Sequence, residues 1–386
     1  MPLADAVRDL EPELIELRRD IHAHPELSWQ EERTTALVAD RLALAGVRIR
    51  QLPKGGLIAD IGTSGPVVAL RADLDALPVE DRTTDPWASK VAGVAHACGH
   101  DVHTVSLLGA GLALATRDLP GRVRLLFQPA EEVMPGGALE LIGEGALDEV
   151  THAFGLHCDP SLDVGSIGLR EGPLTGASDS LTIRLSGKGG HTSRPHLTQD
   201  LTFALGTLVT QLPAALSRRL DPRAGASVVW GMVRSGSATN VIPASGELAG
   251  TVRMLDAVAW ADAEVLIHEL IEQLVAPYGV DADVTYLRGV PPVVNEVGAT
   301  RLLGQAAAAV VGPGHVVPTS QSLGGEDFAW YLDMVPGAMA RLGTRTPGGP
   351  TYDLHQGDLR VDERSVGIGA SLLATVADLA LRVSGG

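Results

Sequence analysis

The densest group of side chains able to do chemistry lies in residues 94–103, which read VAHACGHDVH. One thiol, three imidazoles and one carboxylate occur there within eight residues, at His96, Cys98, His100, Asp101 and His103. Thiolate and imidazole are the soft and borderline ligands that bind zinc and transition metals. The Cys-x-His spacing is not that of a structural zinc finger, because no second Cys/His pair follows it. An isolated cysteine would be interpreted as a small buried residue, but the clustering favours a metal site.

A second motif, Gln128-Pro-Ala-Glu-Glu132, places two adjacent carboxylates after an apolar segment. On extended backbone, neighbouring side chains point to opposite sides, so one carboxylate could bind a metal while the other faces substrate as a general base. A solvated acidic turn explains this pair equally well. His157 and His355 are single histidines, and each considered alone is more typical of a structural residue than of a ligand.

The residues before these motifs predict two helices. Leucine or isoleucine at positions 10, 14, 17 and 21 forms one face of a helix that stops near His24-Pro25. Ser28 and Glu31 have the spacing of a capping box that opens a second helix, and Gly46 ends that helix.

Short apolar segments then alternate with helical ones. The pattern predicts strands over residues 57–61, 67–70, 121–128 and 151–157, with helices over residues 104–116 and 138–147. This alternation indicates an α/β domain with a mostly parallel central sheet. Polar residues come where the strands end, at 71–75, at 131–132 and at the tip of the last strand, His157. Because ligand sites in such sheets lie at the carboxyl ends of strands, we expect these residues to converge.

From about residue 176 the pattern changes to that of an inserted α+β domain. Strands over 181–186, 226–233, 246–254 and 280–287 and helices over 201–220 and 257–276 follow the order β-α-β-β-α-β, which is ferredoxin-like. Helices over 302–311, 328–334 and 365–381 and a strand over 339–342 then resume the first pattern. We therefore predict one domain in two parts, residues 1–175 and 289–386, interrupted by a second domain, residues 176–288.

Composition narrows the class of protein. A length of 386 residues corresponds to two or three domains at ~150 residues each. The formal charge of −17 would repel nucleic-acid phosphates and anionic lipid surfaces, so we expect neither partner. Two cysteines are too few for a secreted disulfide framework. The N-terminus has no apolar signal region, and no stretch approaches the ~18 uncharged apolar residues of a membrane span, so a cytoplasmic protein is expected.

A resemblance covers nearly the whole chain. Nine short motifs carry this resemblance and follow one another along the chain in the order found in a known family. They are residues 71–78 (RADLDALP), 96–103 (HACGHDVH), 128–132 (QPAEE), 154–157 (FGLH), 187–191 (GKGGH), 240–243 (NVIP), 250–253 (GTVR), 325–328 (GEDF) and 354–355 (LH). In these motifs the chain resembles the hippurate hydrolase, N-acyl-amino-acid amidohydrolase and auxin-conjugate hydrolase branch of the aminoacylase/carboxypeptidase metallopeptidase superfamily. The resemblance implies a di-metal exopeptidase-like domain with an inserted ferredoxin-like lid and dimerisation domain.

The resemblance also implies a metal centre and a base. Its ligands would be Cys98, His100, Glu132, His157 and His355, with Cys98 bridging two divalent ions and Glu131 as the general base. Zinc or manganese is expected, and cobalt or nickel is compatible with the branch. Where many relatives in the superfamily carry His-x-Asp and a bridging aspartate, this sequence has Arg71-Ala-Asp73 and Cys98. Asp73 is therefore expected to orient a ligand.

In the inserted domain, the resemblance implies that His191 stabilises the oxyanion. In relatives this histidine commonly reaches the active site of a partner subunit, which implies a homodimer. Asn240 and Arg253 would bind the carboxylate of the substrate, a task that suits the fork of an arginine, although an exposed arginine on a strand could equally form a salt bridge. Arg194, before Pro-His, differs from the small residues of many relatives and leaves the acyl-chain preference open.

Three functions remain open at this point. The first is hydrolysis of N-acyl amino acids by metal-activated water, with Glu131 passing the proton to the leaving nitrogen. The second, within enzymes, is a dipeptidase or carboxypeptidase that cleaves small peptides. The third is a catalytically silent protein that binds amino-acid conjugates. A silent descendant should have lost the base or a ligand, whereas all of these residues are present.

Overall fold

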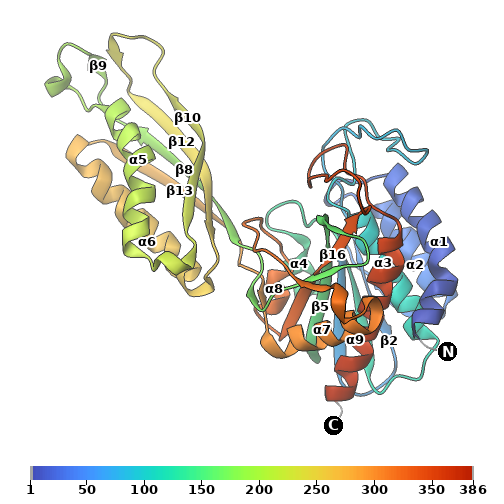
Figure 1. The fold of residues 1–386 in the computed structure, drawn as a ribbon. Coiled ribbons are helices and arrows are strands. Elements are labelled where there is room, and N and C mark those ends of the chain that lie inside the picture. Colours follow the sequence, from blue (N-terminus) through green and yellow to red (C-terminus); the bar gives the residue numbers. More distant parts are fainter. Residues whose placement is uncertain (1–2, 385–386) are drawn as a thin grey trace. The chain divides into compact units, whose positions relative to one another are not determined.

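The computed structural model describes residues 3–384, and the chain divides into two compact units. The first unit comprises Met1–Gly172, Val294–Ser320 and Asp327–Gly386, and the second comprises Pro173–Val293 and Gln321–Glu326. The short strands β7 (Gly172–Pro173) and β14 (Val294–Asn295) lie where the chain passes from one unit to the other. The second unit is thus an insertion into the first (Figure 1).

The first unit is built on an eight-stranded mixed sheet. Its strands, in spatial order, are β1 (Arg48–Gln51), β2 (Leu57–Ile61), β4 (Arg122–Gln128), β3 (Val67–Asp73), β5 (Val150–Asp163), β16 (Gly337–Arg345), β6 (Ile167–Leu169) and β15 (Val316–Pro318). The central pairs β4–β3, β3–β5 and β5–β16 are parallel, and antiparallel pairs occur towards both edges. The predicted α/β architecture with a mostly parallel centre is confirmed.

Helices pack around this sheet. They are α1 (Leu3–Ala23), α2 (Glu32–Leu44), α3 (His100–Ala115), α4 (Gly137–Gly143), α7 (Val297–Val311), the short 3₁₀ turn η4 (Pro313–His315), α8 (Ala329–Leu332) and α9 (Arg364–Ser384). Helix α3 is buried along nearly its whole length, because α1 and α9 pack on it and β3 lies against it (Figure 1). The apolar sequence of α3 fits this buried position. The packing around the helix gives its first residues a rigid support.

Helix α9 is the one helix within residues 3–384 that is long and apolar enough to cross a membrane, by length and composition. In this fold 61% of its most apolar window is buried. Its buried residues include Val366, Leu373 and Val376, which belong to the hydrophobic core of the first unit. The apolar character of α9 is therefore that of a core helix.

The second unit is a four-stranded antiparallel sheet with two helices on one face (Figure 1). The strand order is β10 (Ser227–Ser235), β12 (Ser245–Met254), β8 (Ala177–Ser186) and β13 (Asp281–Val290), and the helices are α5 (Leu201–Arg219) and α6 (Ala257–Val275). Small elements complete it, namely β9 (Gly190–His191), η1 (Pro195–Leu197), η2 (Pro222–Ala224), β11 (Val241–Ile242) and η3 (Ala276–Tyr278). The predicted ferredoxin-like order is confirmed.

Two local predictions about the first unit are wrong. Ser28 and Glu31 do not form a capping box, because the Ser28 hydroxyl donates to Asp75 and the Glu31 side chain makes no cap hydrogen bond to α2. His157 is not at a strand tip, since β5 continues to Asp163. It lies just beyond the end of the pairing between β3 and β5, whose last pair is Arg71 with Gly155. In both cases tertiary contacts decide what the local pattern leaves open.

Candidate metal centre

The motif at 96–103 folds as a turn that enters α3. Cys98 precedes the helix, Gly99 is its N-cap with φ of +87°, and His100 is its first residue. A Cβ added at Gly99 would lie 2.8 Å from the sulfur of Cys158. Both the left-handed backbone and the close approach therefore require glycine at position 99. The turn that this glycine allows sets the positions of Cys98 and His100.

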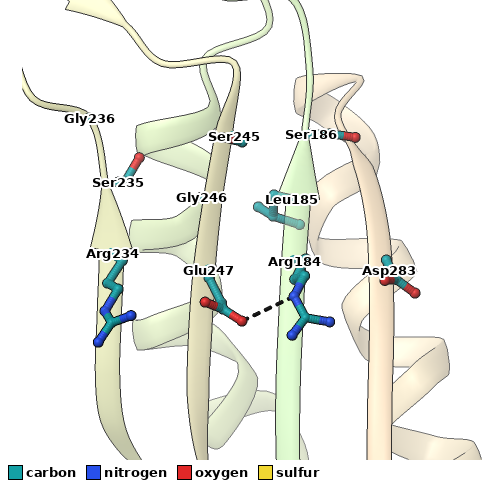
Figure 2. A pocket seen from close by; sticks show the side chains of 10 residues that line it. All are labelled: Arg184, Leu185, Ser186, Arg234, Ser235, Gly236, Ser245, Gly246, Glu247 and Asp283. Carbon is teal, nitrogen blue, oxygen red and sulfur yellow. Dashed lines mark ion pairs between the residues drawn. The ribbon is translucent and has the colours of Figure 1, made fainter.

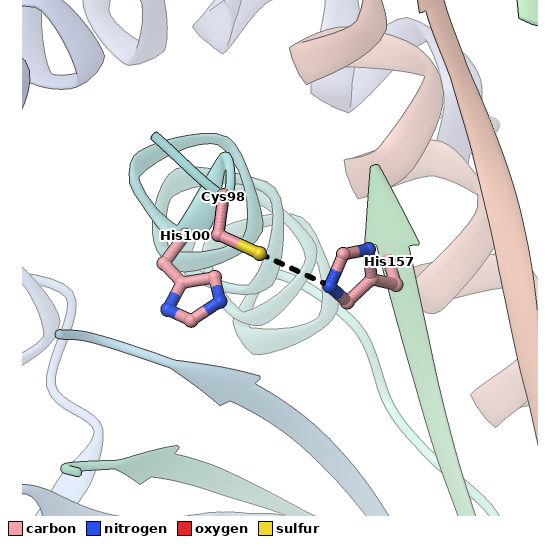
Figure 3. A group of neighbouring side chains, drawn as sticks. All are labelled: Cys98, His100 and His157. Carbon is pink, nitrogen blue, oxygen red and sulfur yellow. Dashed lines mark hydrogen bonds between the residues drawn. The ribbon is translucent and has the colours of Figure 1, made fainter. Parts of the chain in front are cut away.

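Cys98, His100 and His157 form the first group of converging donors (Figure 3). Their sulfur and ring nitrogen atoms lie within 4.8 Å of one another, and all three residues are buried. The Cys98 sulfur is 3.5 Å from Nε2 of His157, which comes from β5. Turn and strand thus bring together residues that the sequence separates widely.

Hydrogen bonds fix the orientation of both histidines. Nδ1 of His100 donates to the carbonyl of Asp75 at 2.9 Å, and Nδ1 of His157 donates to the carbonyl of Cys158 at 2.8 Å. A carbonyl oxygen can only accept, so each Nδ1 carries a proton and each Nε2 faces the shared space. Nε2 of His100 is buried and has no hydrogen-bond partner among the described residues. This is the state expected of a nitrogen that binds a metal.

The other two imidazoles of the motif are arranged differently. His103 uses both nitrogens, because Nδ1 donates to Asp73 at 2.6 Å and Nε2 accepts from the amide of Cys158 at 2.8 Å. His96 is buried, and burial lowers its pKa to about 3, so it is neutral. His103 therefore acts as a bridge between β3 and β5, and Cys158 is a small buried residue.

Cys98, Glu132 and His355 form a second group of converging donors. Oε1 of Glu132 lies 3.3 Å from Nε2 of His355, and the amide of Glu132 donates to Asp75 at 2.9 Å. His355 has a φ of +63°, and its amide donates to Ala97 at 2.7 Å. Its side chain is 54% exposed, and the nearby Glu132 carboxylate raises its pKa. This group therefore faces solvent more than the first does.

Glu131 and Glu132 both approach His100. Oε2 of Glu131 lies 3.9 Å from Nε2 of His100, and Oε1 of Glu132 lies 3.8 Å from the same atom. The prediction that the two carboxylates point to opposite sides is wrong, because β4 ends at Gln128 and the backbone turns before Glu131. Each carboxylate side chain is about one-tenth exposed, at 9% and 10%, so the pair is not a solvated acidic turn.

The donor set fits a divalent metal. Burial alone would lower the pKa of His100, but the charges of Asp73 and its other neighbours raise it, so the field at Nε2 favours a cation. Burial lowers the pKa of His157, which keeps it in the neutral form that binds metals. Burial raises the pKa of the Cys98 thiol, and a coordinated cation would reverse this effect. Sulfur, nitrogen and oxygen donors together suit zinc and its first-row neighbours.

Asp73 lies behind this centre in a buried network that sequence reasoning missed. Arg71 donates to Asp73 at 2.7 Å, to Asp327 at 2.6 Å and to Gln128 at 2.9 Å. Asp73 also binds His103, and its Oδ2 lies 3.8 Å from Nε2 of His100. The sequence did indicate that Arg71 and Asp327 matter, because both belong to the nine motifs of the resemblance. A sequence motif does not show, however, which residues these two side chains contact.

The remaining predicted residues belong to the second unit. His191 in β9 pairs with Val241 of β11, and the amide of Thr192 donates to the carbonyl of Asn240 at 3.2 Å, so His191 and Asn240 are neighbours. Arg253 lies in a different sheet, on β12, and its guanidinium donates to the carbonyl of Leu323. Within this unit the structure brings two of the three residues together.

The second unit also contains two open pockets. One, of about 600 Å³, lies over the ends of β10, β12 and β8, where Arg184 and Glu247 pair at 3.1 Å and Arg234 lies on the neighbouring strand (Figure 2). The other, of about 700 Å³, is lined by Thr192 and by residues 235–239 and 241–243, among others. The second pocket therefore adjoins the segments that carry His191 and Asn240.

Comparisons with known proteins agree with this geometry. Residues 69–379 match the family described as peptidase family M20/M25/M40. The chain is 39% identical to N-acetyl-L-cysteine deacetylase of Bacillus subtilis (strain 168), over 92% of this chain and 85% of that protein. It superposes on the crystal structure of a dinuclear metal-binding peptidase of the M20 family from Bacillus subtilis with a TM-score of 0.84 and 36% identity, over 97% and 99% of the two chains.

A third relative is longer than this chain. A protein of Rhodococcus jostii (strain RHA1) that carries the name glutamate–cysteine ligase 2-3 is 50% identical over 96% of this chain. The chain spans about half the length of that relative, 47%, so the ligase name applies to a larger protein. The match to the family model, by contrast, covers most of the present chain, and the metal-binding relative is matched over 99% of its length. This chain therefore belongs to peptidase family M20/M25/M40.

Proposed function

We propose that this chain hydrolyses the amide bond of N-acyl amino acids or related small conjugates, in a site that holds two divalent metal ions. The observation that carries the proposal is the position of Cys98, whose sulfur belongs to both groups of converging donors. A sulfur shared in this way suits a bridging ligand, with His100 and His157 on one ion and Glu132 and His355 on the other. Two such ions would supply Lewis acidity and lower the pKa of water towards ~7.

Glu131 is the general base in this proposal. It lies beside His100 without belonging to either group that contains Cys98. Its nearly buried carboxylate takes the proton of the attacking water and passes it to the leaving nitrogen. Asp73 acts behind the ligands, because it orients His103 and contributes negative charge beside His100.

Residues of the second unit complete the site in this proposal. His191 donates to the oxyanion that forms on the substrate carbonyl, and Arg253 and Asn240 bind the free carboxylate of the amino acid. We further propose a homodimer in which His191 serves the active site of the partner, with the second unit as lid and dimerisation domain. The pocket lined by Thr192 and residues 235–239 is then available to the part of the substrate next to His191.

The proposed substrate class rests on the charge of the site and on the relatives. Arg253 and two metal ions would attract an anionic substrate to a chain whose formal charge is −17. A relative that is 39% identical carries the name N-acetyl-L-cysteine deacetylase, which supports small N-acyl amino acids. Zinc or manganese is the proposed metal, and a reducing cytoplasm is the proposed compartment, because oxidation of Cys98 would remove a ligand.

The decisive experiment compares two adjacent carboxylates in the purified holoenzyme. Glu131→Gln should abolish hydrolysis of N-acyl amino acids while the metal content stays at two ions per chain. Glu132→Gln should lower the metal content as well as the turnover, because Glu132 is a proposed ligand. Metal is counted by elemental analysis and turnover by release of the free amino acid. Unchanged turnover of Glu131→Gln would remove Glu131 from the role of base.

One panel of assays tests both the substrate class and the identity of the metal. The protein is stripped with a chelator, reconstituted with zinc, manganese, cobalt or nickel, and assayed with N-acyl amino acids and with unblocked dipeptides. Faster turnover of N-acyl amino acids supports the proposal. Faster turnover of dipeptides would instead assign a dipeptidase, and no turnover with full metal content would assign a binding protein.

A further inference from the structure

The turn that carries Glu131 and Glu132, residues 129–136, is held by carboxylates from elsewhere in the first unit. Glu31 accepts a hydrogen bond from the amide of Ala130 at 2.7 Å, and Asp75 accepts one from the amide of Glu132 at 2.9 Å. Just after the turn, Asp327 accepts from the amide of Ala138 at 3.0 Å. The backbone on both sides of Glu131 is therefore fixed by side chains that come from distant segments.

Ala130 has an unusual backbone conformation. Its φ is +55°, in the left-handed region, and the residue is fully buried, at 0% exposure. A non-glycine residue in this region is less stable by roughly 1–2 kcal/mol, so surrounding contacts must hold it there. Two hydrogen bonds provide this support. The amide of Ala130 donates to the Glu31 carboxylate, and the carbonyl of Ala130 accepts from the amide of Gly137 at 3.0 Å.

The stability of α2 does not explain why a glutamate occupies position 31. Glu31 stands at the N-cap position of α2, yet its side chain makes no cap hydrogen bond. The residue is 1% exposed, and its second oxygen has no hydrogen-bond partner within residues 3–384. Burial and the charge of Asp75 raise the pKa of Glu31 to about 7. Keeping a carboxyl in such surroundings is unfavourable, so its contact with Ala130 needs another reason.

We propose that Glu31 is a positioning residue for the reaction. By accepting from the amide of Ala130, it keeps that residue left-handed and so directs Glu131 and Glu132 towards His100. Without this acceptor, the amide of Ala130 is a buried donor with no partner, and the backbone can relax to negative φ. Because the next two side chains follow the backbone, such a change would move both the base and a ligand. The inference rests on the proposed function for the role of Glu131.

Four variants of the holoenzyme test this inference. Glu31→Ala removes the acceptor, Glu31→Gln keeps an acceptor oxygen, Ala130→Gly removes the strain of positive φ, and the fourth combines Glu31→Ala with Ala130→Gly. Glu26→Ala is the matched control, because Glu26 also accepts from backbone amides near the start of α2, those of Arg33 and Thr34 at 2.8 Å each, without touching the turn.

The expected results follow from the geometry. Glu31→Ala should lower kcat and the affinity for the more weakly held metal ion by about 10- to 100-fold each, with KM changed less than about twofold. Glu31→Gln should stay within about threefold of wild type in both quantities, since it retains the acceptor. Adding Ala130→Gly to Glu31→Ala should recover most of the loss, because glycine adopts positive φ without support. Glu26→Ala should change only the free energy of unfolding.

Metal affinity, measured by competition with a chelator, separates this inference from the proposed function. If wild type hydrolyses no N-acyl amino acid, the affinities of the variants still decide the role of Glu31. The inference is overturned if Glu31→Ala binds metal and turns over as wild type does, if Glu31→Gln loses as much as Glu31→Ala, or if Ala130→Gly restores nothing.

Discussion

The sulfur of Cys98 lies 3.5 Å from Nε2 of His157, although 59 positions separate the two residues. Two features produce this contact. Gly99 turns the chain with φ of +87° directly before α3, and β5 runs on past the end of its pairing with β3, which places His157 opposite that turn. The contact therefore belongs to the fold itself and should persist whether or not a metal is bound.

Cys98 and Cys158 form a natural pair for comparison, since both are buried and the chain has two cysteines. Cys98→Ala should lower the metal content and reduce turnover by more than about 100-fold, because loss of a partner outside the ligand shell already costs 10- to 100-fold. Cys158→Ala should keep both metals and destabilise the fold by about 1 kcal/mol, since it removes packing beside Gly99 and the weak hydrogen bond from the Cys158 thiol to the Gly99 carbonyl at 3.7 Å. Elemental analysis and urea unfolding distinguish the two. Full metal content in Cys98→Ala would contradict the bridging role.

Much of the fold could be predicted because apolar periodicity reports burial directly. In β8 the alternation of Leu181, Ile183 and Leu185 with polar residues corresponds to one face packed against α5 and one open face. The helix predicted over residues 104–116 is found as α3, whose apolar sequence accounts for its burial. The ends of β3 and β4 likewise indicated where polar residues would meet, since parallel strands bring their carboxyl ends to one edge.

The details of the site could not be read from local pattern. Ser28 and Glu31 have the spacing of a capping box, but tertiary partners, Asp75 and the amide of Ala130, use their side chains instead. The directions of Glu131 and Glu132 depend on the positive φ of Ala130, which nothing in an alanine reveals. Long-range hydrogen bonds decide these positions, and the paired residues lie 47 positions apart for Ser28 and Asp75 and 99 for Glu31 and Ala130.

Replacement of Arg71 should destabilise the first unit more than replacement of an exposed arginine does. Arg71→Met leaves the buried carboxylates of Asp73 and Asp327 without their cation, which should lower the free energy of unfolding by about 3–5 kcal/mol. Arg50→Met is the control, since Arg50 pairs with Glu144 at 3.1 Å on the surface and should change it by less than about 1 kcal/mol. Urea unfolding measures both. Equal effects would show that the Arg71 network does not support the fold.

Glu31 should make stability depend on pH in a defined window. Its pKa rises from an ordinary 4.5 to about 7 on folding, so the stability that it contributes is fully present below 4.5 and is lost as pH rises through 7. Glu31→Gln should therefore gain stability relative to wild type between pH 5 and 8, reaching about 3 kcal/mol above pH 7. The measurement is urea unfolding of chelator-treated protein.

Glu13 provides a control of opposite sign for this pH dependence. The hydrogen bond and charge of Arg41 lower the pKa of Glu13, so its contribution to stability is present at neutral pH and lost as pH falls below its unfolded value of 4.5. Glu13→Gln should therefore differ from wild type most at neutral pH, with lower stability than wild type. Parallel pH profiles for the Glu31 and Glu13 variants would contradict the assignment of Glu31 as a carboxyl with a raised pKa.

The second unit has a buried acceptor of its own, Asp179, which should control its stability without affecting the metals. Asp179 is 2% exposed and accepts from the indole of Trp260 at 2.8 Å, from the hydroxyl of Tyr286 and from the amide of Gly289 at 2.7 Å. Asp179→Ala leaves all three donors without this acceptor and should lower the free energy of unfolding by at least about 3 kcal/mol.

Tyr286→Phe is the graded counterpart of this change. It removes one donor, while Asp179 keeps the other two, so the loss should be about 1 kcal/mol. Urea unfolding measures the loss of stability, and metal content should remain at the wild-type value in both variants, because the donors of the metal centre lie in the first unit. A loss for Tyr286→Phe as large as that for Asp179→Ala, or loss of metal in either variant, would show that Asp179 does more than satisfy these three donors.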